Sequence, residues 1–140
     1  YNVSCLCGKD FLKTAVSGIS YTGSYWMSAV PFAAGIACIQ KLKRIDAPKL
    51  LNAKGQQLKA GLIATAAKHD LDLRVTGAPS LFYLRLADDP SFMLHQRWIA
   101  ECVKRGVFFT SHHNHFINAA LTDEDIAETL EIADEAFAAL

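Results

Sequence analysis

The sequence predicts an α/β protein in two parts, in which the end of one domain is followed by a small α+β domain. Of its 140 residues, 51% are hydrophobic and 20% are charged, which is typical of a globular protein and argues against disorder. After residue 46, the patterns run helix, two strands, helix, two strands, helix. Residues 1–45 differ, because they combine a strand-like run, an aromatic loop and a very apolar helix.

The first part begins with an apolar run at residues 2–7 that ends at Gly8, which predicts a buried strand. Cys5 and Cys7 would share one face of it, so we expect them to be small core residues. A short helical stretch is predicted at 10–16. Ser28 then precedes an apolar segment with Pro31 in its first turn, so we expect a helix over 29–45 that Ser28 caps. Its first half is small and apolar, and we expect deep burial there, including between subunits.

The second part begins with a helix that starts at Asp46 and Pro48 and runs to about His69. One stripe of it is apolar at Leu51, Leu58 and Leu62. Strands are predicted at 73–75 and 81–86, with a turn at 76–79 between them. In the second of these strands, one face should carry Phe82, Leu84 and Leu86.

The remaining elements follow from capping residues and periodicity. Ser91 is expected to cap a helix that carries Leu94, Trp98 and Cys102 along one stripe and that ends at Gly106. Strands are predicted at 107–110 and 116–120, on either side of a histidine-rich loop at 111–115. A capping box starting at Thr122 should begin a last helix, whose buried side is predicted to hold Ile126, Leu130, Ala133 and Phe137. The sheet should be small, antiparallel or mixed, and covered by helices on one face.

Charge and cysteine content exclude several classes of protein. The formal net charge is zero, which gives no basis for binding nucleic acid or an anionic membrane. No apolar run has transmembrane length. The four cysteines lack a zinc-knuckle spacing, so we expect a reduced, cytoplasmic protein.

Three stretches resemble the class III aminotransferases and, within them, the glutamate-1-semialdehyde aminomutase-like branch. The first is residues 1–9, similar to the strand that follows the family's cofactor lysine. The second is the threonine-aromatic-tryptophan loop at 22–26 with the alanine-rich helix that follows it. The third is 106–125, which resembles the family's C-terminal strands and the start of its last helix.

The resemblance implies fold type I, with residues 1–45 as the end of the large cofactor-binding domain and 46–140 as the small C-terminal domain. It also implies pyridoxal phosphate (PLP) as cofactor, a homodimer, and a small amino-acid or amine substrate. The parent would be an aminotransferase or an aminomutase. The Schiff-base lysine is expected just before Tyr1, so no catalytic residue is expected in this chain. Lys9 and Lys13 align beyond that lysine and are expected to be ordinary surface residues.

The resemblance also implies particular site residues. Ser24 matches the hydroxyl residue that binds the cofactor phosphate of the partner subunit, and Thr22 is near enough to be the donor instead. Tyr25 and Trp26 could line the mouth of the pocket or simply pack. For His113 and Asn114, packing and hydrogen bonding are favoured first and substrate contact second.

Two other interpretations remain open. The chain could be a non-catalytic dimerisation or interaction domain that has kept the fold. A metal protein that uses His112, His113 and His115 is disfavoured, because no cysteine or carboxylate lies next to them in the sequence.

Overall fold

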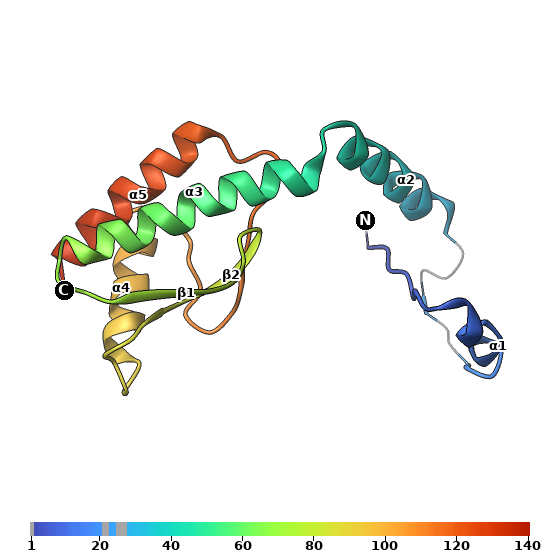
Figure 1. The fold of residues 1–140 in the computed structure, drawn as a ribbon, viewed down its shortest axis with the longest axis horizontal. Helices are drawn as coiled ribbons and strands as arrows, with labels where there is room; N and C mark the ends of the chain where they lie inside the picture. Colours follow the sequence, from blue (N-terminus) through green and yellow to red (C-terminus); the bar gives the residue numbers. More distant parts are fainter. Residues whose placement is uncertain (1, 21–22, 25–27) are drawn as a thin grey trace. The chain divides into compact units, whose positions relative to one another are not determined.

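The chain divides into two compact units, Tyr1–Ile45 and Asp46–Leu140, in a computed structural model (Figure 1) that describes residues 2–20, 23–24 and 28–140. The first unit contains a 3₁₀ helix, η1 (Asp10–Leu12), and two α-helices, α1 (Lys13–Val16) and α2 (Ala29–Arg44). The predicted short helical stretch at 10–16 and the long apolar helix are therefore confirmed.

The predicted strand at residues 2–7 is wrong, because those residues are extended without strand pairing in the described part of the first unit. A strand needs a second backbone to complete its hydrogen bonds, and an extended segment without one stays unpaired. Cys5 and Cys7 are exposed, so the prediction that they are core residues is wrong for this chain. The first half of α2 was predicted to be deeply buried, but α2 contains no buried residue in this chain.

The start of α2 shows why a serine does not always act as a cap. Ser28 occupies the N-cap position with extended backbone, but its side chain makes no capping hydrogen bond. The third helical residue, which normally donates to such a side chain, is Pro31 and has no N–H. The prediction that the Ser28 side chain caps the helix is therefore wrong, although the helix begins at the predicted residue.

The second unit contains a three-stranded antiparallel sheet in the order β1-β2-β3. The strands are β1 (Leu73–Ala78), β2 (Leu81–Leu86) and β3 (His115–Phe116). The first turn is shorter than predicted, because pairing continues to Ala78 and Leu81 and leaves only residues 79–80 outside the strands. Gly77 makes this possible, since it lies in β1 at φ 93° with the Leu81 carbonyl close by.

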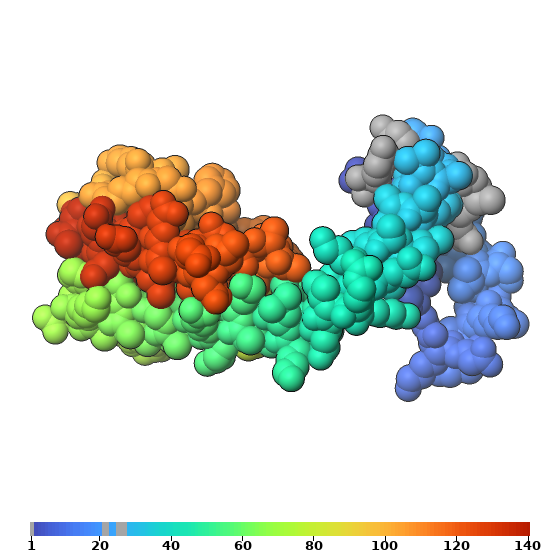
Figure 2. Space-filling view, turned by 90° about the horizontal axis from the view of Figure 1, so that it is seen from above, coloured from blue at the N-terminus to red at the C-terminus, as the bar shows by residue number. Residues whose placement is uncertain are grey.

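Helices cover one face of this sheet. They are α3 (Ala47–Ala67), α4 (Met93–Lys104) and α5 (Asp123–Ala138); α3 and α4 contact the sheet, and α5 packs on both of these helices. Figure 2 shows α5 lying along α3. The predicted inward face of β2 is confirmed, because Phe82, Leu84 and Leu86 are 1%, 1% and 2% exposed.

The helix stripes predicted from the sequence also reach the core. Trp98 and Cys102 of α4 are fully buried, as are Leu62 of α3 and Ala133 of α5. One detail differs at the start of α4, where Phe92 rather than Ser91 holds the N-cap position. Ser91 still contributes there, because its hydroxyl accepts a hydrogen bond from the Met93 N–H.

Of the two strands predicted on either side of the histidine-rich loop, one does not form and the other is shorter than predicted. Residues 107–110 form no strand, because the Thr110 N–H donates to the His115 ring nitrogen Nε2 at 3.1 Å instead of to a neighbouring strand. The strand predicted at 116–120 is only His115–Phe116. It ends early because the Asn118 side-chain oxygen accepts hydrogen bonds from the N–H groups of Ala120 and Leu121.

The start of α5 has the predicted capping box. The Thr122 hydroxyl accepts from the Asp125 N–H, and the Asp125 carboxylate accepts from the Thr122 N–H at 2.7 Å. These bonds lower the pKa of Asp125.

Thr122→Ala is expected to lower the free energy of unfolding by about 1 kcal/mol, because it leaves a helix N–H without its partner. Urea denaturation of the variant beside Thr76→Ala, a strand residue on the exposed side of the sheet, measures it. A loss no larger than that of the control would contradict the role of the cap.

Candidate functional site

Two side chains, one from β2 and one from the loop itself, form hydrogen bonds with backbone carbonyl groups of the loop between α4 and β3. The Tyr83 hydroxyl donates to the Ser111 carbonyl at 3.3 Å, and the Thr110 hydroxyl donates to the His113 carbonyl at 3.2 Å. These bonds leave the side chains of His113 and Asn114 exposed. The two residues that the resemblance placed near a substrate thus point outward from an ordered loop, where a ligand could reach them.

Below this loop lies a groove of about 390 Å³. Its lining is mostly apolar, with a few amide, hydroxyl and imidazole groups, and includes Phe82, Phe109, Ile117, Asn114, Asn118 and Thr129. Phe108 and Phe116 also line it and are 80% and 66% exposed. Such a lining suits an apolar group that carries a small number of hydrogen-bonding atoms.

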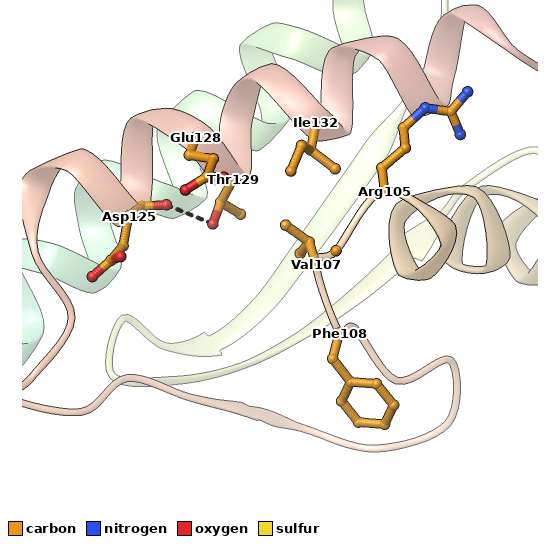
Figure 3. A pocket seen from close by; sticks show the side chains of 8 residues that line it. Arg105, Val107, Phe108, Asp125, Glu128, Thr129 and Ile132 are labelled. Atoms are coloured by element: carbon orange, nitrogen blue, oxygen red, sulfur yellow. Dashed lines mark hydrogen bonds between the residues drawn. The ribbon is translucent and has the colours of Figure 1, made fainter.

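A second cavity, of about 300 Å³, lies between the start of the 107–110 segment and α5 (Figure 3). It shares Val107, Phe108 and Thr129 with the groove. The Thr129 hydroxyl is already committed, because it donates to the Asp125 carbonyl at 2.7 Å.

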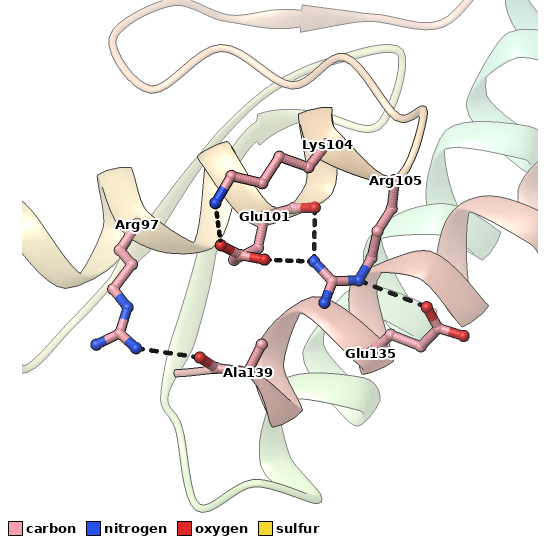
Figure 4. Close-up of polar contacts among 6 residues, drawn as sticks. All are labelled: Arg97, Glu101, Lys104, Arg105, Glu135 and Ala139. Carbon is pink, nitrogen blue, oxygen red and sulfur yellow. Dashed lines mark hydrogen bonds and ion pairs between the residues drawn. The ribbon is translucent and has the colours of Figure 1, made fainter.

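One edge of that second cavity is fixed by ion pairs (Figure 4). Glu101 accepts from Lys104 at 2.6 Å and also from Arg105, and these hydrogen bonds lower the pKa of Glu101 to about 2. Arg105 also reaches Glu135 of α5 at 3.5 Å. We interpret this cluster as structural, because its charges satisfy one another and join α4 to α5.

In the first unit, the structure describes one of the predicted cofactor-binding residues. Ser24 is exposed in a turn. Among the described residues, no atom lies within 4 Å of a Cβ atom added to the preceding Gly23. Thr22, Tyr25 and Trp26 lie outside the described residues.

A cluster of histidine and aromatic side chains was missed by the sequence interpretation. His95 of α4 is 0% exposed and lies between Phe92 and Trp98, with ring centroids 4.8 and 5.7 Å away. Burial lowers the pKa of His95 to about 4. The signal was present, because His95, Trp98, Ile99 and Cys102 share one helix face, but of these only Trp98 and Cys102 were assigned to the buried stripe.

The described residues contain no group of three or more potential metal ligands in one place, although all five histidines are among them. Within the same part of the chain, no helix is long and apolar enough to cross a membrane.

Comparison with known proteins bears on the whole chain. No protein-family profile matches it. Its sequence is 40% identical over 140 residues to an aminopentol aminotransferase of Sphingopyxis macrogoltabida, covering 100% of this chain and 33% of that protein. It is 30% identical over 130 residues to a glutamate-1-semialdehyde 2,1-aminomutase of Methanococcoides burtonii, covering 82% and 30% of the two chains.

The fold agrees with these relatives. The structure of the PLP internal aldimine form of the FumI protein of Sphingopyxis sp. MTA144 superposes with a TM-score of 0.88 and 40% identity, covering 94% of this chain and 32% of that one. The chain thus spans about a third of the length of the relatives it matches. It is a homologue of the class III PLP-dependent aminotransferases and corresponds to their C-terminal part.

Proposed function

We propose that this chain is the C-terminal part of a PLP-dependent enzyme that transfers an amino group to or from an aldehyde or keto substrate. The observation that carries the proposal is the 40% identity to an aminopentol aminotransferase along the entire chain. Both an aminotransferase and an aminomutase occur among the relatives, so the parent protein is proposed to have one of these two activities. Bound PLP would supply an electron sink for the bond changes next to the transferred nitrogen.

Ser24 is proposed to bind the cofactor phosphate. Its hydroxyl and nearby backbone N–H groups suit a phosphate dianion, and Ser24 lies exposed in a turn, where such a group can approach it. Thr22 stays the alternative donor. The Schiff-base lysine is proposed to precede Tyr1, so Lys9 and Lys13 are not assigned to catalysis.

The outward-facing loop at 111–115 is proposed to border the substrate. His113 and Asn114 are exposed there, and Asn114 lies at the apolar groove. From the resemblance alone, we propose that Tyr25 and Trp26, which lie outside the described residues, line the mouth of the substrate pocket. An amine with an apolar chain would suit the groove, and the first relative is named for an amine substrate rather than an amino acid.

We further propose that the parent protein is a homodimer in the cytoplasm. The first unit has no buried residue in its described helices, and α2 exposes Val30, Phe32, Ile36 and Ile39. Such an apolar surface favours association, and Ser24 would then serve the partner's cofactor. The free thiols of Cys5 and Cys7, 3.6 Å apart, suit a reducing compartment.

The test uses a longer protein that includes the residues before Tyr1. Incubated with PLP, it is expected to show the absorption band of a protonated Schiff base and to convert an amine and a keto acid to the corresponding carbonyl compound and amino acid. Ser24→Ala should weaken PLP binding by roughly 10-fold or more through loss of a hydrogen bond to a charged group. Ser17→Ala is the matched control, because its hydroxyl donates only to the nearby Thr14 carbonyl among the described contacts.

The 140-residue chain alone should show no such band. A band in this chain that disappears in Lys9→Ala or Lys13→Ala would overturn the placement of the lysine. Absence of both band and amino transfer in the longer protein would instead favour a dimerisation or interaction domain.

A further inference from the structure

Phe92, immediately before α4, has an unusual backbone conformation. Its φ is 63° with ψ 4°, a left-handed region that is costly for a bulky side chain. Such strain persists only where the surroundings hold the residue in place. Here they do, because the Phe92 ring lies 4.8 Å from His95 of α4 and 4.6 Å from His112 of the histidine-rich loop. Phe92 therefore joins two segments that are far apart in the sequence.

His95, on the inner side of Phe92, is buried in an unusual way. Its side chain is 0% exposed, and neither ring nitrogen has a hydrogen-bond partner among the residues that the structure describes. A neutral imidazole can be buried among these aromatic rings. An imidazolium cannot, because it would place an unpaired charge in an aromatic core.

The charged and titratable groups around His95 increase the free-energy cost of protonating its ring. Arg85 of β2, His112 of the loop and His115 of β3 all oppose a positive charge on its ring. Arg85 also lies over the Phe92 ring, at 5.2 Å from its centre. Asp89 favours the charge, but its carboxylate already accepts from the His95 backbone N–H at 2.8 Å and from the Ser91 hydroxyl.

We propose that Phe92, His95 and His112 form an acid-sensitive latch that holds the histidine-rich loop, residues 111–115, against the start of α4, and that protonation of His95 opens it. Once His95 is charged, the aromatic contacts that keep Phe92 in its strained conformation are lost. Phe92 can then return to an ordinary conformation and release His112, and the loop with it.

The latch responds between pH 6.5 and 4. An unfolded or opened His95 titrates near 6.5, whereas the buried side chain has a pKa of about 4. The open state therefore binds the proton first, so opening becomes easier as the pH falls through this interval and levels off below it. From pH 7 to pH 4, the equilibrium constant for opening should rise roughly 100-fold through His95 alone. Burial opposes ionisation of Asp89, yet its hydrogen bonds lower its pKa below 3.8, so Asp89 acts below this interval.

Amide hydrogen exchange of the 140-residue chain, followed by NMR from pH 7 to pH 4.5 and corrected for intrinsic rates, tests the latch. The amides of His95 and Thr110 are informative, because the first donates to Asp89 and the second to His115. Their opening constants should rise at least about 10-fold more than those of the β1–β2 pairs. Protonation of His115 would itself remove the acceptor of the Thr110 N–H, so only the part of the Thr110 response that disappears in His95→Phe is assigned to the latch. Equal changes at all sites would mean global acid unfolding and would overturn the latch.

His95→Phe replaces the ring with one that cannot be protonated, and should remove most of this extra pH dependence. Gln96→Ala is the matched control, since Gln96 is exposed next to His95 on α4; it should behave as the unchanged chain. If His95→Phe does not fold, an NMR pH titration of the His95 ring in the unchanged chain tests the proposal instead. The ring signals should remain those of a neutral ring down to about pH 5, and a midpoint near 6.5 would refute the proposal.

Discussion

Trp98→Ala is expected to lower the free energy of unfolding of the second unit by about 3–5 kcal/mol. Trp98 is 0% exposed, and its ring stacks on Phe137 of α5 with centroids 4.5 Å and planes 6° apart. It also contacts Phe109 at 5.6 Å, so truncation leaves a cavity between α4, α5 and the 107–110 segment. Because domains of this size have total stabilities of about 5–15 kcal/mol, the variant should be largely unfolded at moderate urea.

Urea denaturation followed by far-ultraviolet circular dichroism measures this loss. Trp98→Phe is the matched variant, because the Trp98 indole nitrogen has no hydrogen-bond partner among the described residues, so phenylalanine loses area but no bond. It should cost much less than alanine. A loss below about 1 kcal/mol for Trp98→Ala would show that this ring is not central to the core.

Gly55→Ala should destabilise the second unit by about 3 kcal/mol, at the upper end of what overpacking usually costs. A Cβ atom at Gly55 would lie 1.9 Å from the Pro79 carbonyl oxygen and 2.4 Å from its carbon. Both are backbone atoms of the β1–β2 turn, so no rotamer change relieves the clash. The turn and α3 would have to move apart.

Gly61→Ala on the same helix is the control. A Cβ atom there would lie 2.5 Å from Cδ1 and 2.7 Å from Cδ2 of Leu130, the methyl ends of a side chain that can shift. Alanine is also the better helix former by about 1 kcal/mol, so this variant should lose clearly less stability than Gly55→Ala. Thermal unfolding measures the loss of stability in both variants. Equal losses would contradict the close approach of α3 to the β1–β2 turn.

Elements with a strong periodic signal were predicted correctly. The alternation in β2 was predicted because a buried face repeats every second residue, and the capping box of α5 because its two bonds are local. The family resemblance was also confirmed. In contrast, the strands predicted at 2–7 and 107–110 depended on pairing partners, which periodicity alone does not identify. The turn at 79–80 was missed because Gly77 was assigned to a turn rather than to a kinked strand.

The candidate site was less accessible to prediction. Ser24, His113 and Asn114 came from the resemblance, and their binding roles remain predictions. His95 was overlooked because a histidine among apolar residues at helical spacing was not considered part of the core. The left-handed conformation of Phe92 gave no sequence signal at all, because phenylalanine rarely adopts it.

The packing of α5 on α3 has a consequence for how the second unit folds. The β1–β2 hairpin joins strands separated by residues 79–80, whereas α3 and α5 contact each other across the whole intervening sequence. Closing that long loop costs entropy before any contact compensates for it. We therefore expect the hairpin to form early and α5 to dock late. Weakened contacts of Phe137 or Leu130 should then mainly accelerate unfolding, leaving the rate of folding nearly unchanged.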